Sequence, residues 1–325
     1  MIDRSALAAA AFIALTMFAN AKAPAAVPEA LGPDRARLFL TRVGFAPSEA
    51  EVGRWADLTQ TQAVDKVLAQ TARVAVKPAP EWADEAIVSP RDLRTMSEEA
   101  GKKERQKQIR HGLELRAWWL DEMATTQSPL TERMTLFWHN HFVSAQPKVR
   151  YAQLMYRQNV LLRSHAVGNF ATLLHAVAHD PAMLIYLDTA TNRRDAPNEN
   201  FAREVMELFT LGEGQYSEVD IKEAARAFSG WSLDLDRATF LFRPRLHDAG
   251  EKTVLGRRGA WQGDDVLDIL LEQPATAEFI VRKLWLEFVS PQPEPQCIRL
   301  IARRFRSSGY EIRTALRDLF LQPEL

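Results

Sequence analysis

The chain has 325 residues, of which 46% are hydrophobic and 26% are charged. This composition supports a large packed core and excludes an intrinsically disordered protein. The 41 basic and 42 acidic residues give a formal net charge of −1, which argues against a surface built to bind nucleic acid. The single cysteine, Cys297, excludes an intramolecular disulfide bond.

The first residues have the pattern of an export signal. An apolar run over 6–19 is followed by two Ala-x-Ala sites, which predict cleavage after Ala21 or Ala23. We therefore expect a signal peptide over 1–23, an Ala- and Pro-rich linker over 24–33, and a periplasmic or secreted mature chain. The apolar run is too short to cross a bilayer as a helix, so no transmembrane span is expected in the mature chain. An uncleaved membrane anchor is the alternative.

Helical periodicity dominates from residue 34 onward. Apolar residues recur at spacings of three and four, as they do along one face of a helix. The sequence therefore predicts an all-α fold, a multi-helical orthogonal bundle. We expect a single large helical domain over 34–325, with an N-terminal helical part at 34–127 and a site-bearing part at 128–325. The core is expected to include Trp118, Phe137, Phe201, Val205, Leu208, Phe228 and Trp285.

The helix predicted from Ser128 onward carries the first candidate for chemistry. His141 falls on the apolar face of this helix, whereas His139 points almost the opposite way. The two rings therefore cannot chelate one metal ion within a regular helix. Only His141 remains a candidate, and the alternative is a core histidine whose ring is hydrogen-bonded.

The segment 197–231 is predicted to be a helical hairpin that carries the site. Its two helices are capped by Asn198 or Asn200 and by Ser217. Gly212 is placed to end the first helix in the left-handed conformation. A polar stripe flanks the apolar face of the first helix, at the edge of the core, where burial shifts the pKa of a carboxylate. This stripe consists of Asn200, Glu204 and Glu207.

One short β element is predicted near residues 237–257. Residues 239–242 and 252–255 alternate weakly and are expected to pair as a β-hairpin or flap. His247 and Asp248 lie in its loop, and catalytic groups are often found on loops. An Asx-turn beside a surface histidine is the alternative.

Four blocks of the sequence resemble the signature blocks of a known family. They are FWHNHF (137–142), HDPAMLIYLD (179–188), PNENFAREVMELFTLGEGQYSEVDIKEAARAFSGW (197–231) and HDAGEKTVLG (247–256). In this order they resemble the bacterial domain of unknown function family 1800, and the likeness covers nearly the whole mature chain. The resemblance implies an exported, mostly helical protein. It implies no reaction, because the family has no settled activity.

The polar residues of the hairpin and flap fit acid–base chemistry, because paired carboxylates and a histidine can move protons. We assign Glu204 as the general acid or base, with His141, His247 and Asp248 as the other catalytic residues. Arg203 is expected to pair with a charged group of the ligand or with Glu207. The predicted ligand-binding residues are Asn198, Glu199, Asn200, Arg203 and Glu207.

The cofactor and the partner stay open. A divalent metal held by His141, Glu204, His247 and Asp248 has little support, because these four residues lack a metal-binding spacing. The expected partner is an envelope polymer or another exported protein, and no nucleic acid is expected.

Two functions of different classes remain. The first is an envelope or extracellular hydrolase or transferase. The second is a non-catalytic exported glycan-binding or assembly protein, in which the same polar cluster is a ligand pocket or a structural network. Convergence of His141, Glu204 and His247 around an open cleft would favour the enzyme. Separate side chains, each satisfied by backbone partners, would favour the second function.

Overall fold

The computed structural model describes residues 29–325. The predicted signal peptide over 1–23 lies outside the described residues, together with the start of the predicted linker. Helices make up most of the described chain, in agreement with the all-α prediction. They are α2 (Gly32–Val43), α3 (Glu49–Ala56), α4 (Gln60–Ala69), α5 (Pro90–Thr95), α6 (Glu98–Thr125), α7 (Pro129–His141), α8 (Gln146–Val149), α9 (Ala152–His165), α10 (Phe170–Ala178), α11 (Pro181–Tyr186), η1 (Thr189–Thr191), α12 (Asn200–Glu204), η2 (Val205–Thr210), α13 (Glu218–Ala227), η3 (Pro244–Leu246), α14 (Gly263–Glu272), α15 (Pro274–Phe288), α16 (Pro295–Ser307) and α17 (Ile312–Phe320). Within the described residues, no helix combines the length and the apolar character needed to span a membrane.

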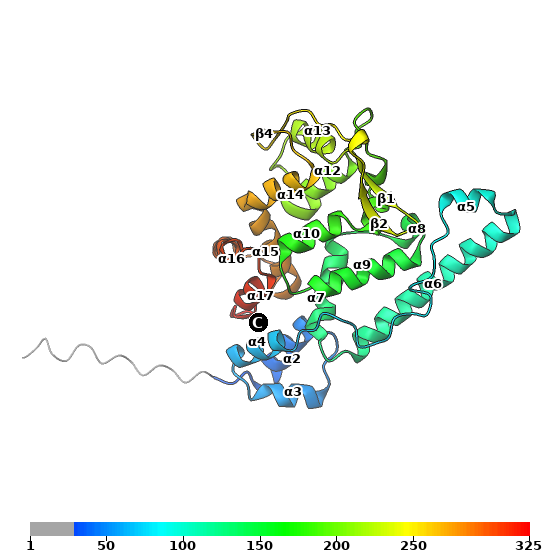
Figure 1. Cartoon of the computed structure of the whole chain (residues 1–325). Helices are drawn as coiled ribbons and strands as arrows, with labels where there is room; N and C mark the ends of the chain where they lie inside the picture. The colour runs from blue at the N-terminus through cyan, green and yellow to red at the C-terminus, as the bar shows by residue number, and fades with distance from the viewer. Residues whose placement is uncertain (1–28) are drawn as a thin grey trace, which may run out of the picture.

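The helices close into one body because the first helices pack against the last ones (Figure 1). α17 contacts α4, and α15 packs against α16, α17 and α2. The side-chain amide of Gln60 donates to the carbonyl oxygen of Phe320 at 3.0 Å, and Arg317 forms an ion pair with Asp65 at 2.6 Å. One continuous hydrophobic core therefore joins helices from both ends of the described chain.

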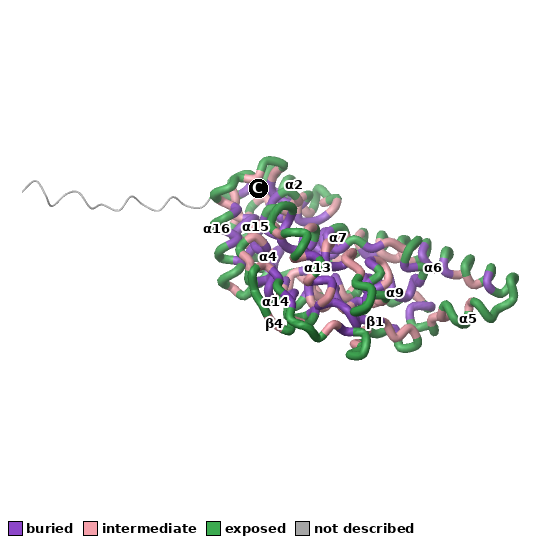
Figure 2. The backbone as a smooth tube through the Cα atoms, turned by 90° about the horizontal axis from the view of Figure 1, so that it is seen from above, coloured by how far each residue is buried: buried purple, intermediate pink, exposed green. Residues whose placement is uncertain are grey.

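α5 and α6 form an arm that projects from this body (Figure 1, Figure 2). α6 has 28 residues, which is about 42 Å at a rise of 1.5 Å per residue. At its base, Trp119 Nε1 donates to Glu132 of α7 at 2.9 Å. Arg163 of α9 donates to the same carboxylate from Nε at 2.6 Å and from Nη2 at 2.9 Å. These contacts between three helices fix the direction in which the arm leaves the body.

The β part differs from the prediction in its pairing. β2 (Thr239–Phe242) pairs antiparallel with β1 (Trp231–Asp234), and β3 (Lys252–Val254) pairs antiparallel with β4 (Arg257–Gly259). The expected pairing of 239–242 with 252–255 is therefore wrong. Each strand takes its nearest neighbour in the chain, because a short loop costs less entropy to close. Gly256 has φ +77°, a conformation that allows the tight turn between β3 and β4. The weak alternation of polar and apolar residues in the sequence did not predict this turn.

Most of the side chains predicted for the core are buried, namely Phe137, Phe201, Val205, Phe228 and Trp285. Leu208 is an error of the prediction, since it is 42% exposed. Trp118 is only partly buried, and its indole Nε1 donates to the carbonyl of Pro78 at 2.8 Å. Trp118 therefore covers the side of the arm, where its polar edge finds a backbone acceptor.

Candidate functional site

The first helix of the predicted hairpin changes its winding halfway. It begins as α12 and continues as the π-helix η2, in which the Leu211 N–H donates to the Met206 carbonyl at 2.8 Å. The Thr210 hydroxyl donates to the Val205 carbonyl at 2.5 Å and supports the wider turn. The expected regular helix to about Leu211 is therefore only half correct. The wider winding turns Leu208 to solvent and buries Met206 in its place.

The hairpin nevertheless ends and restarts as predicted. Gly212 has φ +80°, the left-handed conformation that favours glycine at the end of a helix. Ser217 caps α13, and its side chain and that of Asp220 form a capping box. Local sequence signals therefore determine both of these boundaries.

The asparagines at the start of the hairpin bind the protein's own backbone. The Asn198 side-chain oxygen accepts from the Asn200 N–H at 3.0 Å, and the Asn200 amide donates to the Leu187 carbonyl at 3.2 Å. Asn192 accepts from the Asn198 N–H at 3.0 Å and donates to the Ala225 carbonyl at 2.8 Å. Contrary to expectation, neither Asn198 nor Asn200 is the N-cap, because that position is Glu199, whose side chain makes no capping hydrogen bond. The asparagines thus tie the loop to the end of α11 and to α13.

Arg203 pairs with other carboxylates than expected. It donates to both carboxylate oxygens of Glu218 at 2.8 Å and to Glu199 at 3.3 Å. The expected pairing with Glu207 is wrong, because that carboxylate instead accepts from the Tyr216 hydroxyl at 2.6 Å. These contacts join the start of α12 to the start of α13 across the hairpin.

Glu204 differs from the other predicted catalytic residues in the hydrogen bonding of its side chain. Among the described residues, no donor forms a hydrogen bond with its half-buried carboxylate. Burial raises the pKa of Glu204, the charge of Glu207 raises it further, and Arg203 opposes both effects. The direction of this shift suits a proton donor or acceptor.

His141 lies at the C-terminal end of α7 and binds the π-helix. Its Nε2 donates to the Phe209 carbonyl at 3.1 Å, while its Nδ1 accepts from Lys283 Nζ at 3.0 Å. Lys283 also donates to the Leu208 carbonyl at 3.3 Å. Burial, with the Lys283 charge adding to it, holds the pKa of His141 well below its usual range, and burial lowers the pKa of Lys283. The two side chains satisfy carbonyls that the end of a helix leaves without partners.

His247 and Asp248 hold the loop between the two β-hairpins onto α13. His247 Nδ1 donates to the Ser229 carbonyl at 2.9 Å. Asp248 accepts from Arg226 Nε at 2.7 Å, and this hydrogen bond is the main reason that the pKa of Asp248 is lowered. Arg226 also binds Glu223 at 2.8 Å and 3.0 Å. The ring of His247 is buried, so the loop carries a second polar network rather than an open side chain.

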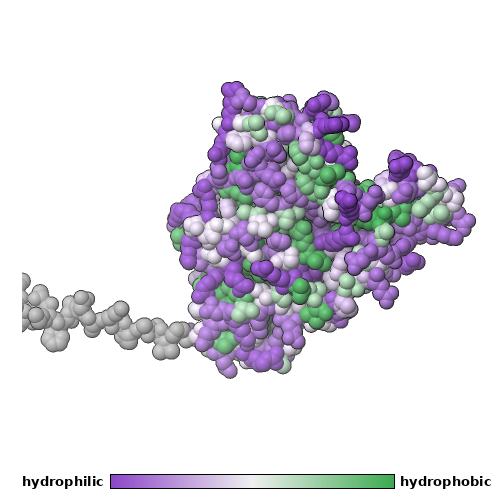
Figure 3. Space-filling view, viewed as in Figure 1, coloured by the Kyte–Doolittle hydropathy of each residue, from purple (hydrophilic) through white to green (hydrophobic). Residues whose placement is uncertain are grey.

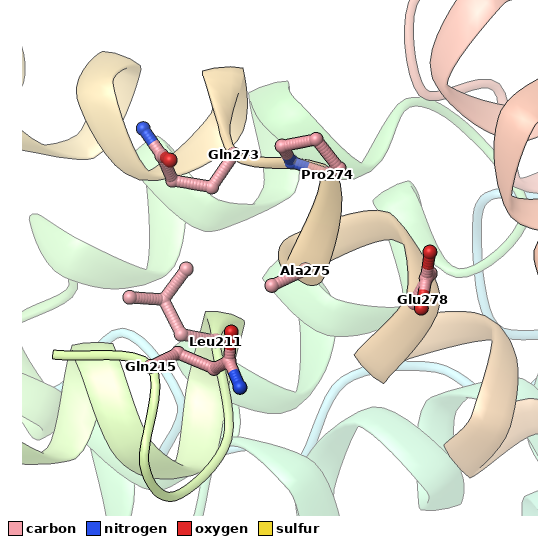
Figure 4. Close-up of a pocket in the computed structure, with 6 residues that line it drawn as sticks. All are labelled: Leu211, Gln215, Gln273, Pro274, Ala275 and Glu278. Atoms are coloured by element: carbon pink, nitrogen blue, oxygen red, sulfur yellow. The ribbon is translucent and has the colours of Figure 1, made fainter.

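No hydrogen bond within the described residues joins His141, Glu204 and His247 to one another. His141, Glu204 and His247 share no hydrogen-bond partner among the described residues. A pocket of about 340 Å³ lies at the far end of η2, where Leu211 points toward Ala275 (Figure 4). A second pocket, of about 540 Å³, is lined by residues 242–246. Neither pocket is lined by a predicted site residue, so the N-terminal end of α12 is not the mouth of either.

A different polar cluster joins α10 to α14, and the sequence analysis missed it. His175 Nδ1 binds Asp264 at 3.1 Å and its Nε2 binds Asp268 at 3.0 Å, while His179 Nε2 lies 3.2 Å from Asp264. The hydrogen bond that His175 donates to the Asp264 carboxylate raises the pKa of His175. The four-residue spacing within each pair was the signal in the sequence, because it places both members on one helix face.

No three His, Cys, Asp or Glu residues in 29–325 are arranged to hold a metal ion. In the α10–α14 cluster, the carboxylates instead serve as hydrogen-bond and ion-pair partners of the imidazole rings. Of the four residues considered as a metal set, His141 binds the Phe209 carbonyl, whereas His247 and Asp248 both bind Ser229.

Comparison with known proteins identifies the family but no activity. The chain belongs to the family described as "Protein of unknown function (DUF1800)", whose model matches residues 38–325. The resemblance found in the four sequence blocks is thereby confirmed over nearly the whole chain. No curated protein and no solved structure matches this chain.

Proposed function

We propose that this chain is an exported, non-catalytic assembly protein that binds its partner through the α5–α6 arm. Support comes first from the polar residues, since His141 and His247 each bind a backbone carbonyl in a different part of the molecule. The asparagines and Arg203 also bind groups of this chain. Such networks fix one packing of the helices, which is a sufficient role for buried polar groups.

The observation that carries the proposal is an apolar stripe on the solvent side of α6. It consists of five residues spaced by three or four, which we call the outer stripe: Ile109, Leu113, Ala117, Leu120 and Ala124. The three large members are 64%, 54% and 65% exposed, respectively. A solvated helix face is normally polar, and a contiguous apolar patch on a surface marks an interaction site. Hydrophobic side chains are visible on the projecting arm in Figure 3.

Site-specific photo-crosslinking in the cell tests the proposal. A photoreactive amino acid at Leu113 should give a discrete adduct in the exported fraction. The same group at Val219, which is 64% exposed on α13, should give none. The adduct should disappear when Leu120→Glu is added, because a charge in the stripe prevents an apolar contact. A Leu113 probe that yields no adduct, or one that survives Leu120→Glu, would refute the proposal.

A second candidate function keeps Glu204 as the general acid or base of an envelope hydrolase or transferase. It is favoured by one observation, the raised pKa of a half-buried carboxylate without a hydrogen-bond donor in the described part of the chain. Glu204→Gln tests this second function, because an enzyme that uses Glu204 should lose its activity on an envelope polymer while the fold and the Leu113 adduct are retained. If no activity is lost, the second function is refuted.

A further inference from the structure

We infer that the pocket at the end of β2 binds the phosphate group of an anionic lipid headgroup. This pocket, of about 540 Å³, is lined by the consecutive residues Phe242, Arg243, Pro244, Arg245 and Leu246. Its size is within the range of sites that hold small molecules. The inference goes beyond the assembly function and does not depend on the α5–α6 arm, because the pocket lies on other elements of the fold.

A second segment of the chain lies beside the pocket and adds positive charge to it. The Arg194 N–H donates to the Leu246 carbonyl at 2.8 Å. The Gly230 N–H donates to the Asn192 carbonyl at 3.0 Å, and the Gly230 carbonyl accepts from the Arg243 N–H at 2.8 Å. These hydrogen bonds hold the two segments side by side. Four exposed arginines therefore share one part of the surface, namely Arg193, Arg194, Arg243 and Arg245.

Most of this positive charge has no counter-charge on the protein. Three of the four guanidinium groups form no hydrogen bond or ion pair with any residue in 29–325, namely Arg193, Arg243 and Arg245. The acidic residues of the same two segments are already paired, Asp195 with Arg194 at 3.5 Å and Asp248 with Arg226 at 2.7 Å. A free guanidinium offers two parallel N–H groups that match the oxygen atoms of a phosphate. The charge of the pocket therefore favours an anion.

The apolar side chains of the pocket favour an amphiphile over a simple anion. Phe242 is partly buried and Leu246 is 37% exposed, and both line the pocket beside the guanidinium groups. Leu241, the preceding residue on β2, is 38% exposed. A lipid combines a phosphate with an apolar part, and arginines near a membrane are attracted to its anionic surface. A polyanion such as a nucleic acid would leave the apolar side chains without a partner.

Close backbone contacts hold the pocket in place. Gly230 has φ +84°, and a Cβ at this position would lie 2.8 Å from the Arg243 carbonyl oxygen and 3.0 Å from the His247 Cβ. His247 follows the pocket residues, and its ring donates to the Ser229 carbonyl at 2.9 Å. The loop is thus anchored at both ends. A ligand therefore does not have to order the backbone before it binds, which favours affinity.

Vesicle co-sedimentation of the purified mature protein tests the inference. The protein should bind vesicles that contain phosphatidylglycerol and should not bind vesicles of phosphatidylcholine alone, because only the first carry a net negative charge. Arg243→Gln combined with Arg245→Gln should weaken this binding about 30-fold, as expected for two arginines near an anionic surface. Arg299→Gln combined with Arg303→Gln is the matched control, since both arginines are exposed on α16 and line neither pocket. Circular dichroism of each variant shows whether the fold is retained.

Two further measurements separate a lipid from a soluble phosphate. Calorimetric titration with glycerol phosphate should show weaker binding than titration with phosphatidylglycerol vesicles, because glycerol phosphate has no apolar part. Leu246→Ser should weaken vesicle binding several-fold, because an apolar contact is lost. Leu286→Ser is the control for that change, at a site on α15 that is 47% exposed, and it should leave binding unchanged.

The results that overturn the inference differ from those that overturn the assembly function. A protein that binds neither kind of vesicle, or both equally, overturns it. Equal weakening by the two pairs of arginine substitutions also overturns it, because the general surface charge would then be the cause. Glycerol phosphate that binds as tightly as the vesicles would overturn the lipid as the ligand. The assembly function is tested separately by the Leu113 adduct, and its failure would leave the lipid site standing.

Discussion

Replacing Glu132 by glutamine should loosen the attachment of α6 to the body. Glu132 and Arg163 are both 1% exposed, and the carboxylate accepts from Arg163 twice and from Trp119 once. Glutamine keeps one acceptor oxygen but leaves the buried guanidinium without a counter-charge. Removing one member of a buried ion pair costs about 3–5 kcal/mol. We expect about 3 kcal/mol, because one acceptor is retained.

Urea unfolding followed by circular dichroism measures this loss as a change in the free energy of unfolding. Glu287→Gln is the matched control, since Glu287 pairs with Arg133 at 2.9 Å and the two side chains are 32% and 26% exposed. That substitution should cost at most about 1 kcal/mol. Combining Glu132→Leu with Arg163→Met should restore most of the stability, because no buried charge then remains. Similar losses for Glu132→Gln and Glu287→Gln would refute the reasoning.

Two further predictions concern pH and backbone conformation. The hydrogen bonds that the His175 ring donates to the Asp264 and Asp268 carboxylates raise the pKa of His175 above its usual range, with Asp264 the larger cause. Its contribution to stability is therefore complete below the unfolded pKa and is lost as the pH rises through the folded pKa. His175→Gln should flatten the fall in Tm as the pH rises above about 6.5, the usual histidine pKa, and an unchanged profile would contradict this. Gly212→Ala should cost about 2 kcal/mol and Gly214→Ala about 1 kcal/mol in chemical denaturation. Both glycines have φ near +80°, but only at Gly212 would an added Cβ lie 2.9 Å from a ring carbon; equal costs would exclude that contact as the cause.

Local signals in the sequence were sufficient for the boundaries of the hairpin. The capping box of Ser217 and the left-handed Gly212 depend only on residues close in the chain. The π-helix between them could not be predicted this way. Its carbonyl groups are bound by His141 and Lys283, which reach them from two distant helices. Periodicity therefore placed Leu208 in the core, although the wider turn directs it outward.

For the candidate site too, the sequence could identify polar residues but could not predict which distant parts of the chain they contact. The sequence placed His141 on the apolar face of a helix and His247 in a loop, and both rings are buried. It could not show that each ring binds a backbone carbonyl, because the acceptors lie at other positions in the fold. The spacing of His175 and His179 was readable, but their carboxylate partner Asp264 is brought close only by the packing of α10 on α14.

The contact between α4 and α17 sets an order of events during synthesis. Gln60 and Phe320 are joined by a hydrogen bond across 260 positions of the chain. The apolar face of α4, which includes Val64 and Val67, stays uncovered until α17 has been made. Contacts between residues so far apart form late, because a long loop must first be closed. The N-terminal helices are thus translated first, yet they reach their final packing last.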